Sequence, residues 1–509
     1  MANKLLLNFV GGMNVKTSPL IIKDNEAELI LNYNLDKLGA LTRRNGYIIF
    51  ATRPVAANKV ISGLFGGFSI NNRANFQYMT VNNSGDTARV TYYNNAGTWT
   101  TTDDTSQSPF KPTTGSAGEL YMTRFVSFLN YVFRLNGGNA PVSFLVTTPQ
   151  TATTTNLTDT DTSAALSITP SVGAVFQDRV YFNRCGDGFR SRLYYSTIGT
   201  SGSTITWDTD AVTGQWFDVN PDDGDFITAL ENNGNRLLIF KNFSMYRWTF
   251  GQVEADRIIG VGTTSQESVK TNFDLGITFF ANPKGVYAYT DGRPKLISRK
   301  IQDYIDAVSD WKYVAAGVDN DHYRLSVGDL TVNGRTITNA VLVYTISLDA
   351  WTIDSLGVKP TVWAEMASTY PTKNLYFGGT DGRTYQFNSG TSDSASGADT
   401  TIASDFISKE YLLSYPNRTN INWIDVFSIR QVASSVFYDL DRQGLFPELG
   451  SITQRTSNFR PPIRECNSIR MKVADNSSNI SVIEGFNIDH VPKEKRDEMD
   501  VKIRRRNDI

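Results

Sequence analysis

The chain has very little of the two residue types that carry most metal-binding and nucleophilic chemistry, with two cysteines and two histidines in 509 residues. Cys185 and Cys466 lie far apart, which predicts neither a disulfide framework nor a cysteine-based metal site and favours a reducing cytoplasm as the place of folding. With only His322 and His490, a Ser-His-Asp or Cys-His mechanism has almost no material. We therefore expect no cofactor, no metal and no enzyme activity, and a structural role for His322.

Long hydrophobic runs and an excess of charge of one sign are also missing. No segment approaches the apolar length that crosses a bilayer, and the first ten residues lack a cleavage-like site, so we expect neither a membrane span nor a signal peptide. Lys and Arg number 49 against 51 Asp and Glu, a formal charge of −2. This balance removes any global argument for a protein held on nucleic acid by phosphate neutralisation.

A repeated hairpin dominates what is present. An alternating apolar and aromatic strand is followed by a turn rich in Gly, Asn or Asp and then by a second strand. The pattern recurs at Tyr78, Tyr131, Tyr181, Leu237, Val286, Tyr323 and Leu375. The spacing of roughly 40 to 55 residues is the period of a four-stranded propeller blade. The sequence predicts an all-β protein that is mainly a β-propeller of about six or seven blades.

The composition changes along the chain and predicts five parts. Residues 1–55 form an N-terminal docking segment, with a short helix after Asp24 or Asn25. Residues 56–390 form the propeller, and residues 391–402, rich in Ser, Gly, Ala and Asp, form a linker. Alternating runs over residues 403–490 predict a small C-terminal β-sandwich. Residues 491–509 form a charged tail, either a helix or an arm that orders only on a partner.

An acidic loop is the strongest candidate for a metal site. Asp218, Asp222, Asp223 and Asp225 supply oxygen ligands of the kind that calcium takes. The spacing does not fit an EF-hand, because Gly224 falls one place late and no Glu closes the loop. A solvated loop between blades is the favoured interpretation.

Glycoside chemistry is the enzymatic alternative for a propeller. It needs paired carboxylates and, in sialidases, an arginine cluster with repeated Asp-box turns. The nearest sequences, at residues 95–99 and 347–351, lack essential positions of that turn. A propeller that binds or hydrolyses host-surface glycans would place aromatic residues such as Trp207, Trp216 or Trp248 beside loop carboxylates on one open face.

Three stretches in order suggest a family. The first combines Gly-Gly-Met-Asn at residues 11–14 with Ser-Pro-Leu at 18–20 and a strand ending in Arg-Arg-Asn-Gly-Tyr at 43–47. The second runs through residues 224–246, and the third through residues 285–301. Together they resemble phage tail nozzle proteins, also called tail tubular protein B or packaged-DNA stabilisation proteins. The likeness extends loosely over most of the chain, and the order of the three stretches is what carries it.

The resemblance implies a structural virion protein, made in the host cytoplasm and located in the tail. It implies a homo-oligomeric ring, usually a hexamer, below the portal and adaptor, which retains the packaged genome and conducts it during ejection. The expected partners are the head-to-tail adaptor, other tail proteins or fibres and, transiently, genomic DNA. The candidate residues for docking to the adaptor or a neighbouring subunit are Gly11, Gly12, Asn14, Arg43, Arg44 and Tyr47. Alternatively, the N-terminal segment supplies a missing strand to the propeller.

Overall fold

The computed structural model describes residues 2–54, 59–69, 74–83, 86–104, 107, 122–154, 156–183, 189–199, 205–252, 255–369, 372–395, 397–414, 417–430, 434–477 and 480–493. Strands dominate these residues, which confirms the all-β prediction. The only α-helix among them, α1 (Gln302–Asp306), has five residues, and the 3-10 helices are η1 (Pro221–Asp223), η2 (Gln266–Ser268), η3 (Arg299–Ile301), η4 (Trp311–Tyr313) and η5 (Ile346–Leu348). Within the described part of the chain, no helix has the length and apolar character needed to span a bilayer.

The chain divides into two compact units, and neither is continuous in sequence. One comprises Gly46–Tyr344 and Ser355–Thr400, and the other comprises Met1–Asn45, Thr345–Asp354 and Thr401–Ile509. The N-terminal residues are therefore shared between the units and do not form a separate segment over residues 1–55.

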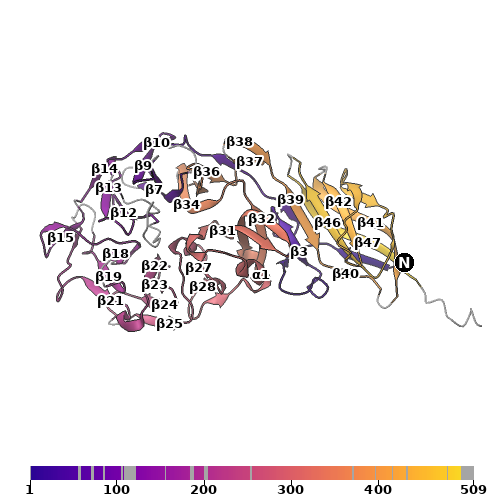
Figure 1. Cartoon of the computed structure of the whole chain (residues 1–509), viewed down its shortest axis with the longest axis horizontal. Coiled ribbons are helices and arrows are strands. Elements are labelled where there is room, and N and C mark those ends of the chain that lie inside the picture. The colour runs from indigo at the N-terminus through magenta and orange to yellow at the C-terminus, as the bar shows by residue number, and fades with distance from the viewer. Residues whose placement is uncertain are drawn as a thin grey trace, which may run out of the picture. The chain divides into compact units, whose positions relative to one another are not determined.

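The larger unit is a propeller of seven blades around a common centre (Figure 1). Blade 1 consists of β7 (Ile61–Ser69), β8 (Ala74–Asn82), β9 (Arg89–Asn95) and β10 (Thr98–Thr101). Blade 2 consists of β11 (Arg124–Phe128), β12 (Tyr131–Leu135), β13 (Val142–Leu145) and β14 (Thr148–Thr153). Blade 3 consists of β17 (Gly173–Phe176), β18 (Arg179–Asn183), β19 (Arg192–Tyr195) and β21 (Trp216–Asp218). A small separate sheet holds β15 (Thr158–Asp159), β16 (Ala164–Ala165) and β20 (Thr206–Trp207).

Blade 4 consists of β22 (Ile227–Asn232), β23 (Leu237–Lys241), β24 (Ser244–Trp248) and β25 (Asp256–Ile259). Blade 5 consists of β26 (Lys270–Asn272), β27 (Ile277–Asn282), β28 (Gly285–Tyr289) and β29 (Lys295–Leu296). Blade 6 contains β30 (Ala315–Val318), β31 (His322–Val332) and β32 (Arg335–Thr345), and blade 7 contains β34 (Pro360–Thr369), β35 (Thr372–Gly379), β36 (Thr384–Phe387) and β6 (Tyr47–Ile49). The prediction of six or seven blades is confirmed at seven.

Six of the seven repeat positions found in the sequence lie on the second strand of a blade. The exception is Val286, which lies on β28, the third strand of blade 5. Both β27 and β28 are short and aromatic, and only Pro283 and Lys284 separate them. Their sequences alone therefore do not show which is the second strand of the blade and which is the third. This displacement explains the short interval between Val286 and Tyr323.

Hairpin turns join the strands within each blade, and shared hydrophobic cores join neighbouring blades. Asn333 and Gly334 join β31 to β32 with φ values of 51° and 76°. Since a two-residue hairpin of this type needs two positive φ angles, Asn-Gly suits it, as predicted. Buried side chains then cross from blade to blade, for example Phe240 of blade 4, which packs at 5.0 Å between ring centroids on Phe280 of blade 5.

Blade 7 is completed by a strand from before blade 1. Strand β6 pairs antiparallel with β36, with Tyr47 opposite Phe387. The Tyr47 ring packs edge-on against Phe377 and Tyr385 at 5.2 and 5.1 Å. The closing-strand interpretation is thus confirmed for residues 47–49. Strands β37 (Ser392–Ala395) and β38 (Ala398–Thr401) continue this sheet beyond β6, so the predicted linker at residues 391–402 is wrong.

The smaller unit contains the two sheets of a sandwich. The first has the order β4 (Tyr33–Leu35), β5 (Leu41–Arg43), β47 (Val482–Pro492), β41 (Thr419–Arg430) and β44 (Thr456–Phe459), with β1 (Ala2–Leu6) on β47 and β45 (Glu465–Cys466) on β41. The second has β33 (Ala350–Ser355), β3 (Glu26–Leu31), β39 (Ser404–Ser408), β46 (Ser468–Asp475), β42 (Ser435–Leu440) and β43 (Glu448–Ser451), with β2 (Gly12–Met13) on β3 and β40 (Tyr411–Leu412) on β46. One core, including Phe9, Phe406 and Phe486, is shared by both sheets.

The helix predicted after Asp24 is wrong, because β3 occupies residues 26–31. Ala27, Leu29 and Ile30 are buried, and the strand pairs with β39. The acidic residues that suggested a helical first turn are used otherwise: Glu26 accepts a hydrogen bond from Asn14 at 2.9 Å. Tertiary pairing here overrides local helix signals. The predicted tail begins inside β47, and its residues 494–509 lie outside the described residues.

Truncating Tyr47 should test how far the propeller depends on β6. Tyr47→Ala removes a fully buried ring and is expected to lower the free energy of unfolding by about 3–5 kcal/mol. Ile48→Ala on the same strand is the control, since Ile48 is exposed and should change the value by less than about 0.5 kcal/mol. Urea denaturation measures both, and equal effects would contradict the closing role of Tyr47.

Candidate functional site

The propeller has a central cavity. Its volume is about 820 Å³, and the innermost strands of all seven blades line it. Pockets of this size hold small ligands in many proteins. The walls combine aromatic side chains, such as Phe125 and Trp363, with amides and with charged groups of both signs.

An ion pair crosses this cavity. Arg124 begins β11 of blade 2, and its Nη1 atom lies 2.6 Å from Glu267 Oε1, on η2 just before blade 5. Blades 2 and 5 lie on opposite sides of a seven-blade ring, so the pair ties distant walls together. Lys270 Nζ adds a second contact to Glu267 at 3.5 Å. Burial lowers the pKa of Arg124, and Glu267 partly offsets that effect.

Glu231 is the titratable group that stands out. It lies near the end of β22, half-buried in the cavity wall. Burial raises its pKa to about 7, against the attraction of Lys270 and hydrogen bonds from Thr271, while Glu267 raises it further. A carboxyl group that changes protonation near neutral pH inside a cavity is the kind of group found at functional sites.

Asp319, which follows β30 of blade 6 and also lines the cavity, behaves differently. Burial would raise its pKa, but Arg324 and His322 outweigh burial and hold the pKa well below its ordinary value. Arg324 Nη2 lies 3.0 Å from Asp319 Oδ2, and His322 Nδ1 lies 3.0 Å from Oδ1. His322 begins β31, and its contact with Asp319 supports the structural role predicted for it.

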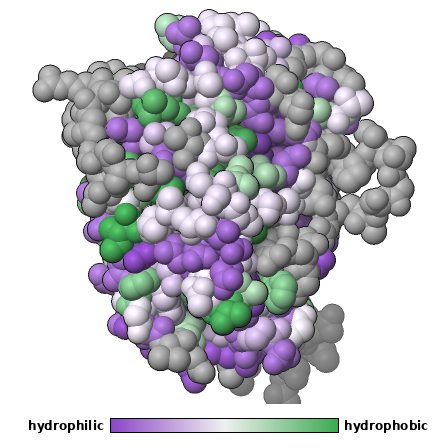
Figure 2. Space-filling model, turned by 90° about the vertical axis from the view of Figure 1, so that its left-hand side faces the viewer, coloured by the Kyte–Doolittle hydropathy of each residue, from purple (hydrophilic) through white to green (hydrophobic). Residues whose placement is uncertain are grey.

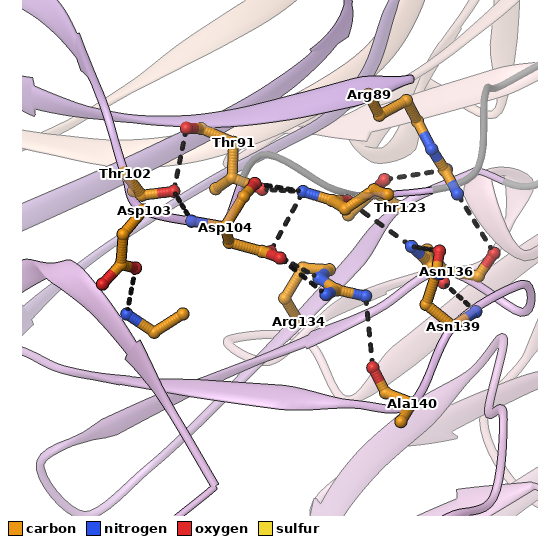
Figure 3. Close-up of polar contacts among 12 residues, drawn as sticks. Arg89, Thr91, Thr102, Asp103, Asp104, Thr123, Arg134, Asn136, Asn139 and Ala140 are labelled. Atoms are coloured by element: carbon orange, nitrogen blue, oxygen red, sulfur yellow. Dashed lines mark hydrogen bonds and ion pairs between the residues drawn. The ribbon is translucent and has the colours of Figure 1, made fainter. Parts of the chain in front are cut away.

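A polar network behind Thr123 supports the wall at blade 2 (Figure 3). Arg89 donates to Thr123 Oγ1 at 3.0 Å, and Arg134 donates two hydrogen bonds to the Asp104 carboxylate at 3.0 and 3.1 Å. Arg89 and Arg134 are almost fully buried. Thr123 itself lines the cavity beside Arg124, so the network fixes the position of the wall from which the crossing ion pair starts.

The sequence did not reveal these cavity residues, since Arg124, Glu231 and Glu267 lie far apart in it. A weak signal was present. Polar residues end several innermost strands, as Glu231-Asn232 end β22 and Asn272 ends β26, where the strand pattern alone favours apolar residues.

The six residues predicted for docking are distributed over both units. Gly11, Gly12 and Asn14 lie beside or within β2, and a Cβ atom on Gly12 would come within 2.8 Å of Ala350. Tyr47 belongs to the propeller, where it closes blade 7. The residues are close in sequence, but the fold does not gather them into one exposed surface. Their docking role stays a prediction.

Arg43 and Arg44 are buried inside the sandwich. Arg43 donates to the Ser477 carbonyl oxygen. Arg44 Nε donates to Asn32 Oδ1 at 2.9 Å and lies 3.9 Å from Asp354 Oδ1, with both charged side chains only 1% exposed. These contacts hold the end of the N-terminal segment against β33.

The acidic loop lies against the buried side chain of Lys241. The ammonium group of Lys241, fully buried, lies 2.8 Å from Asp223 Oδ1 and donates to Ser191 Oγ and the Asn220 carbonyl oxygen at 2.9 and 3.0 Å. Asp218 instead pairs with Arg192 at 2.7 Å, and no group of potential ligands that could hold a metal was found among the described residues. The acidic loop joins blades 3 and 4 and none of its η1 residues is buried, as the favoured interpretation has it, but Asp223 in addition neutralises a buried lysine.

The tryptophans and the cysteine Cys466 considered in the sequence analysis are placed by the fold in positions that favour a structural role. Trp207 and Trp248 are buried in the propeller cores, so they do not form the open aromatic face imagined for glycans. Trp216 lies under the Arg192 guanidinium at 3.4 Å. Burial raises the pKa of the Cys466 thiol to about 12, which makes it a poor nucleophile. Cys185 lies outside the described residues.

No family model matches the chain, and no curated protein matches it. Among solved structures, the chain is similar to the extracellular domains of a putative hybrid two component system and a putative one component system from B. thetaiotaomicron, each 9% identical, with TM-scores of 0.37 and 0.42. These matches cover 79% and 86% of this chain but only 44% and 58% of those chains. The C-terminal WD40 domain of Sif2 is 9% identical with a TM-score of 0.35, over 71% of this chain and 94% of that domain. Likeness at this level assigns no activity.

Arg44→Met separates a structural role from a docking role. Removing one member of a buried ion pair is expected to cost about 3–5 kcal/mol of unfolding free energy. Arg418→Met is the control, because Arg418 pairs with Asp441 at the exposed surface of the same unit, where such pairs contribute about 0–1 kcal/mol. Denaturation in urea measures the difference. If Arg44→Met left the free energy of unfolding unchanged but abolished attachment of the protein to tail-less phage particles, the result would instead support a docking role for Arg44.

Glu231 should make the stability of the protein depend on pH. Its folded-state pKa of about 7 lies above its ordinary value, so the folded state binds more protons than the unfolded state between pH of about 4.5 and 7. Stability should therefore fall as the pH rises through this window. Glu231→Gln should match the wild type near pH 4.5 and exceed its melting temperature at pH 8.

The matched control for this profile is Glu365→Gln, at the exposed rim of the cavity where Glu365 pairs with Lys373 at 3.2 Å. That variant is expected to follow the wild-type profile. A Glu231→Gln variant with a constant offset at every pH would show that Glu231 does not titrate in this window.

Proposed function

We propose that the protein is a structural component of a phage tail, assembling into a ring below the portal and adaptor that retains and then conducts the genome. The support is the ordered resemblance of residues 11–47, 224–246 and 285–301 to tail nozzle proteins, together with one structural observation. That observation is a set of exposed apolar side chains on the outer face of the first sheet of the sandwich.

This outer face carries polar residues as well as apolar ones. Leu5 of β1 lies opposite Asn487 of β47, which lies opposite Asp425 of β41, while the neighbouring row of Leu6, Phe486 and Val426 points into the core. The outer face carries the exposed residues Leu5, Trp423, Ile429 and Val491. Arg460 lies over the Trp423 ring at 5.5 Å.

The sandwich is rich in such residues. Among the described residues, ten of the twenty exposed large hydrophobic side chains belong to this smaller unit. On the side of the propeller that carries β15, by contrast, hydrophobic residues stand in small separate groups among hydrophilic ones (Figure 2). Exposed apolar area concentrated on one part of a protein favours association, and copies of one chain that associate head to tail form a ring when the rotation between them closes. We therefore assign subunit contacts to the sandwich.

The propeller cavity is not the path of the genome in this proposal. A volume of about 820 Å³ with a crossing Arg124–Glu267 ion pair leaves no room for a duplex. The genome would pass through the space that the ring of subunits encloses. The near-neutral charge of the chain suits a channel that must not retain DNA, since each lysine or arginine contact to phosphate adds affinity.

Single-particle electron microscopy tests the proposal, on the purified protein alone and after mixing with tail-less particles. The wild type should form rings with rotational symmetry and a central hole, six-fold if the resemblance holds, or should cap the particles. Trp423→Asp replaces an exposed apolar side chain of this outer face by a charge and should abolish both assemblies while circular dichroism stays unchanged.

Phe243→Asp is the control, because Phe243 is more exposed than Trp423, at 78% against 42%, but lies on a propeller turn. It should assemble normally. Wild-type protein that remains as isolated discs and never attaches to particles would contradict the proposal and favour a propeller that binds or hydrolyses host-surface glycans.

A further inference from the structure

The central cavity of the propeller has no role in ring assembly, yet its walls have the features of a ligand site. We propose that it binds an uncharged saccharide. This inference goes beyond the proposed function and does not depend on it, since the cavity is complete within one propeller.

The pattern of charge in the wall favours an uncharged ligand. Glu267 is paired with Arg124 and Lys270 at 2.6 and 3.5 Å. Glu365 is paired with Lys373, and Asp319 with Arg324, at 3.2 and 3.0 Å. An anionic ligand would lie against these carboxylates and a cationic one against Arg124 and Lys270, so either would compete with existing pairs. A neutral molecule leaves the pairs intact.

The wall offers hydrogen-bond donors and acceptors together, which suits a ligand with many hydroxyl groups. Lys270 donates, Glu231 and the carbonyl groups accept, and the side chains of Asn320 and Thr271 do both. Because the pKa of Glu231 is about 7, its carboxyl group can also donate when it is protonated. Hydroxyl groups act as both donors and acceptors and therefore match such a wall.

An aromatic ring stands at the cavity. Phe273, in the turn between β26 and β27, lines the cavity while 65% of it is exposed. An exposed ring costs free energy unless it contacts something apolar, and the C–H face of a pyranose ring is a suitable surface. Leu275, two residues further along the same turn and 51% exposed, does not line the cavity.

The binding test uses the full chain and three uncharged trisaccharides: maltotriose, tri-N-acetylchitotriose and 2′-fucosyllactose. Spermidine and tripolyphosphate serve as charged probes. Saturation-transfer NMR and calorimetry should show at least one trisaccharide binding with a Kd on the order of 1 mM or tighter, and neither charged probe binding as well. Binding of no trisaccharide, or preference for a charged probe, would overturn the proposal.

Variants locate the binding. Phe273→Ala should weaken it about fivefold, the loss expected for an aromatic contact of about 1 kcal/mol. Leu275→Ala, the matched control, should leave the Kd unchanged within about twofold. Equal effects of the two substitutions would mean that the saccharide binds outside the cavity. Trp423→Asp should not alter saccharide binding, so failure of ring assembly and failure of this inference are separable.

Discussion

The propeller depends on the pairing of the three-residue strand β6 with β36. Seven sheets around one axis leave no free end only if the last sheet is complete, and the strand that completes it precedes the first blade in sequence. The pairing brings residues more than 330 positions apart into register, so the whole ring forms one cooperative unit. Tyr47 secures it by packing against Phe377 of β35 and Tyr385 of β36.

The sandwich follows the same rule, since it too is built from both ends of the chain. Strands β1 to β5 and strands β39 to β47 share one core, with β1 on β47 and β3 on β39. A truncation at either end removes strands from the interior of this unit, and not only a peripheral arm. The buried Arg44–Asp354 pair belongs to this construction, since a charge with this little exposure requires a partner of opposite sign.

Buried charge in the propeller is handled in the same way. Lys241 is neutralised by Asp223, Arg134 by Asp104, and Arg124 by Glu267. The first two fix loops within or beside one blade, whereas the third spans the cavity. Glu231 is the exception, because Lys270 and Thr271 only partly compensate its burial. Most charged groups of the interior are therefore paired, and this pairing is the basis for assigning an uncharged ligand to the cavity.

The sequence by itself determined the class of fold, the repeat and the hairpin turns, because these rest on local chemistry. Alternating apolar residues and Asn-Gly turns are properties of a few neighbouring residues, and Asn333-Gly334 forms the turn that it predicts. The sandwich over residues 403–490 was visible for the same reason, as was the closing strand as one of two alternatives.

Only the tertiary structure decided the roles of residues whose partners are distant in sequence. The acidic run at residues 24–28 indicates a helix until β39 pairs with β3, and residues 391–402 indicate a linker until they extend blade 7. Arg124 and Glu267 acquire their relation only when blades 2 and 5 face each other. The local sequence pattern therefore determines which strands and turns form. The positions of the cavity residues depend on burial and on strand pairing between distant segments, and these arise only when the ring and the sandwich have closed.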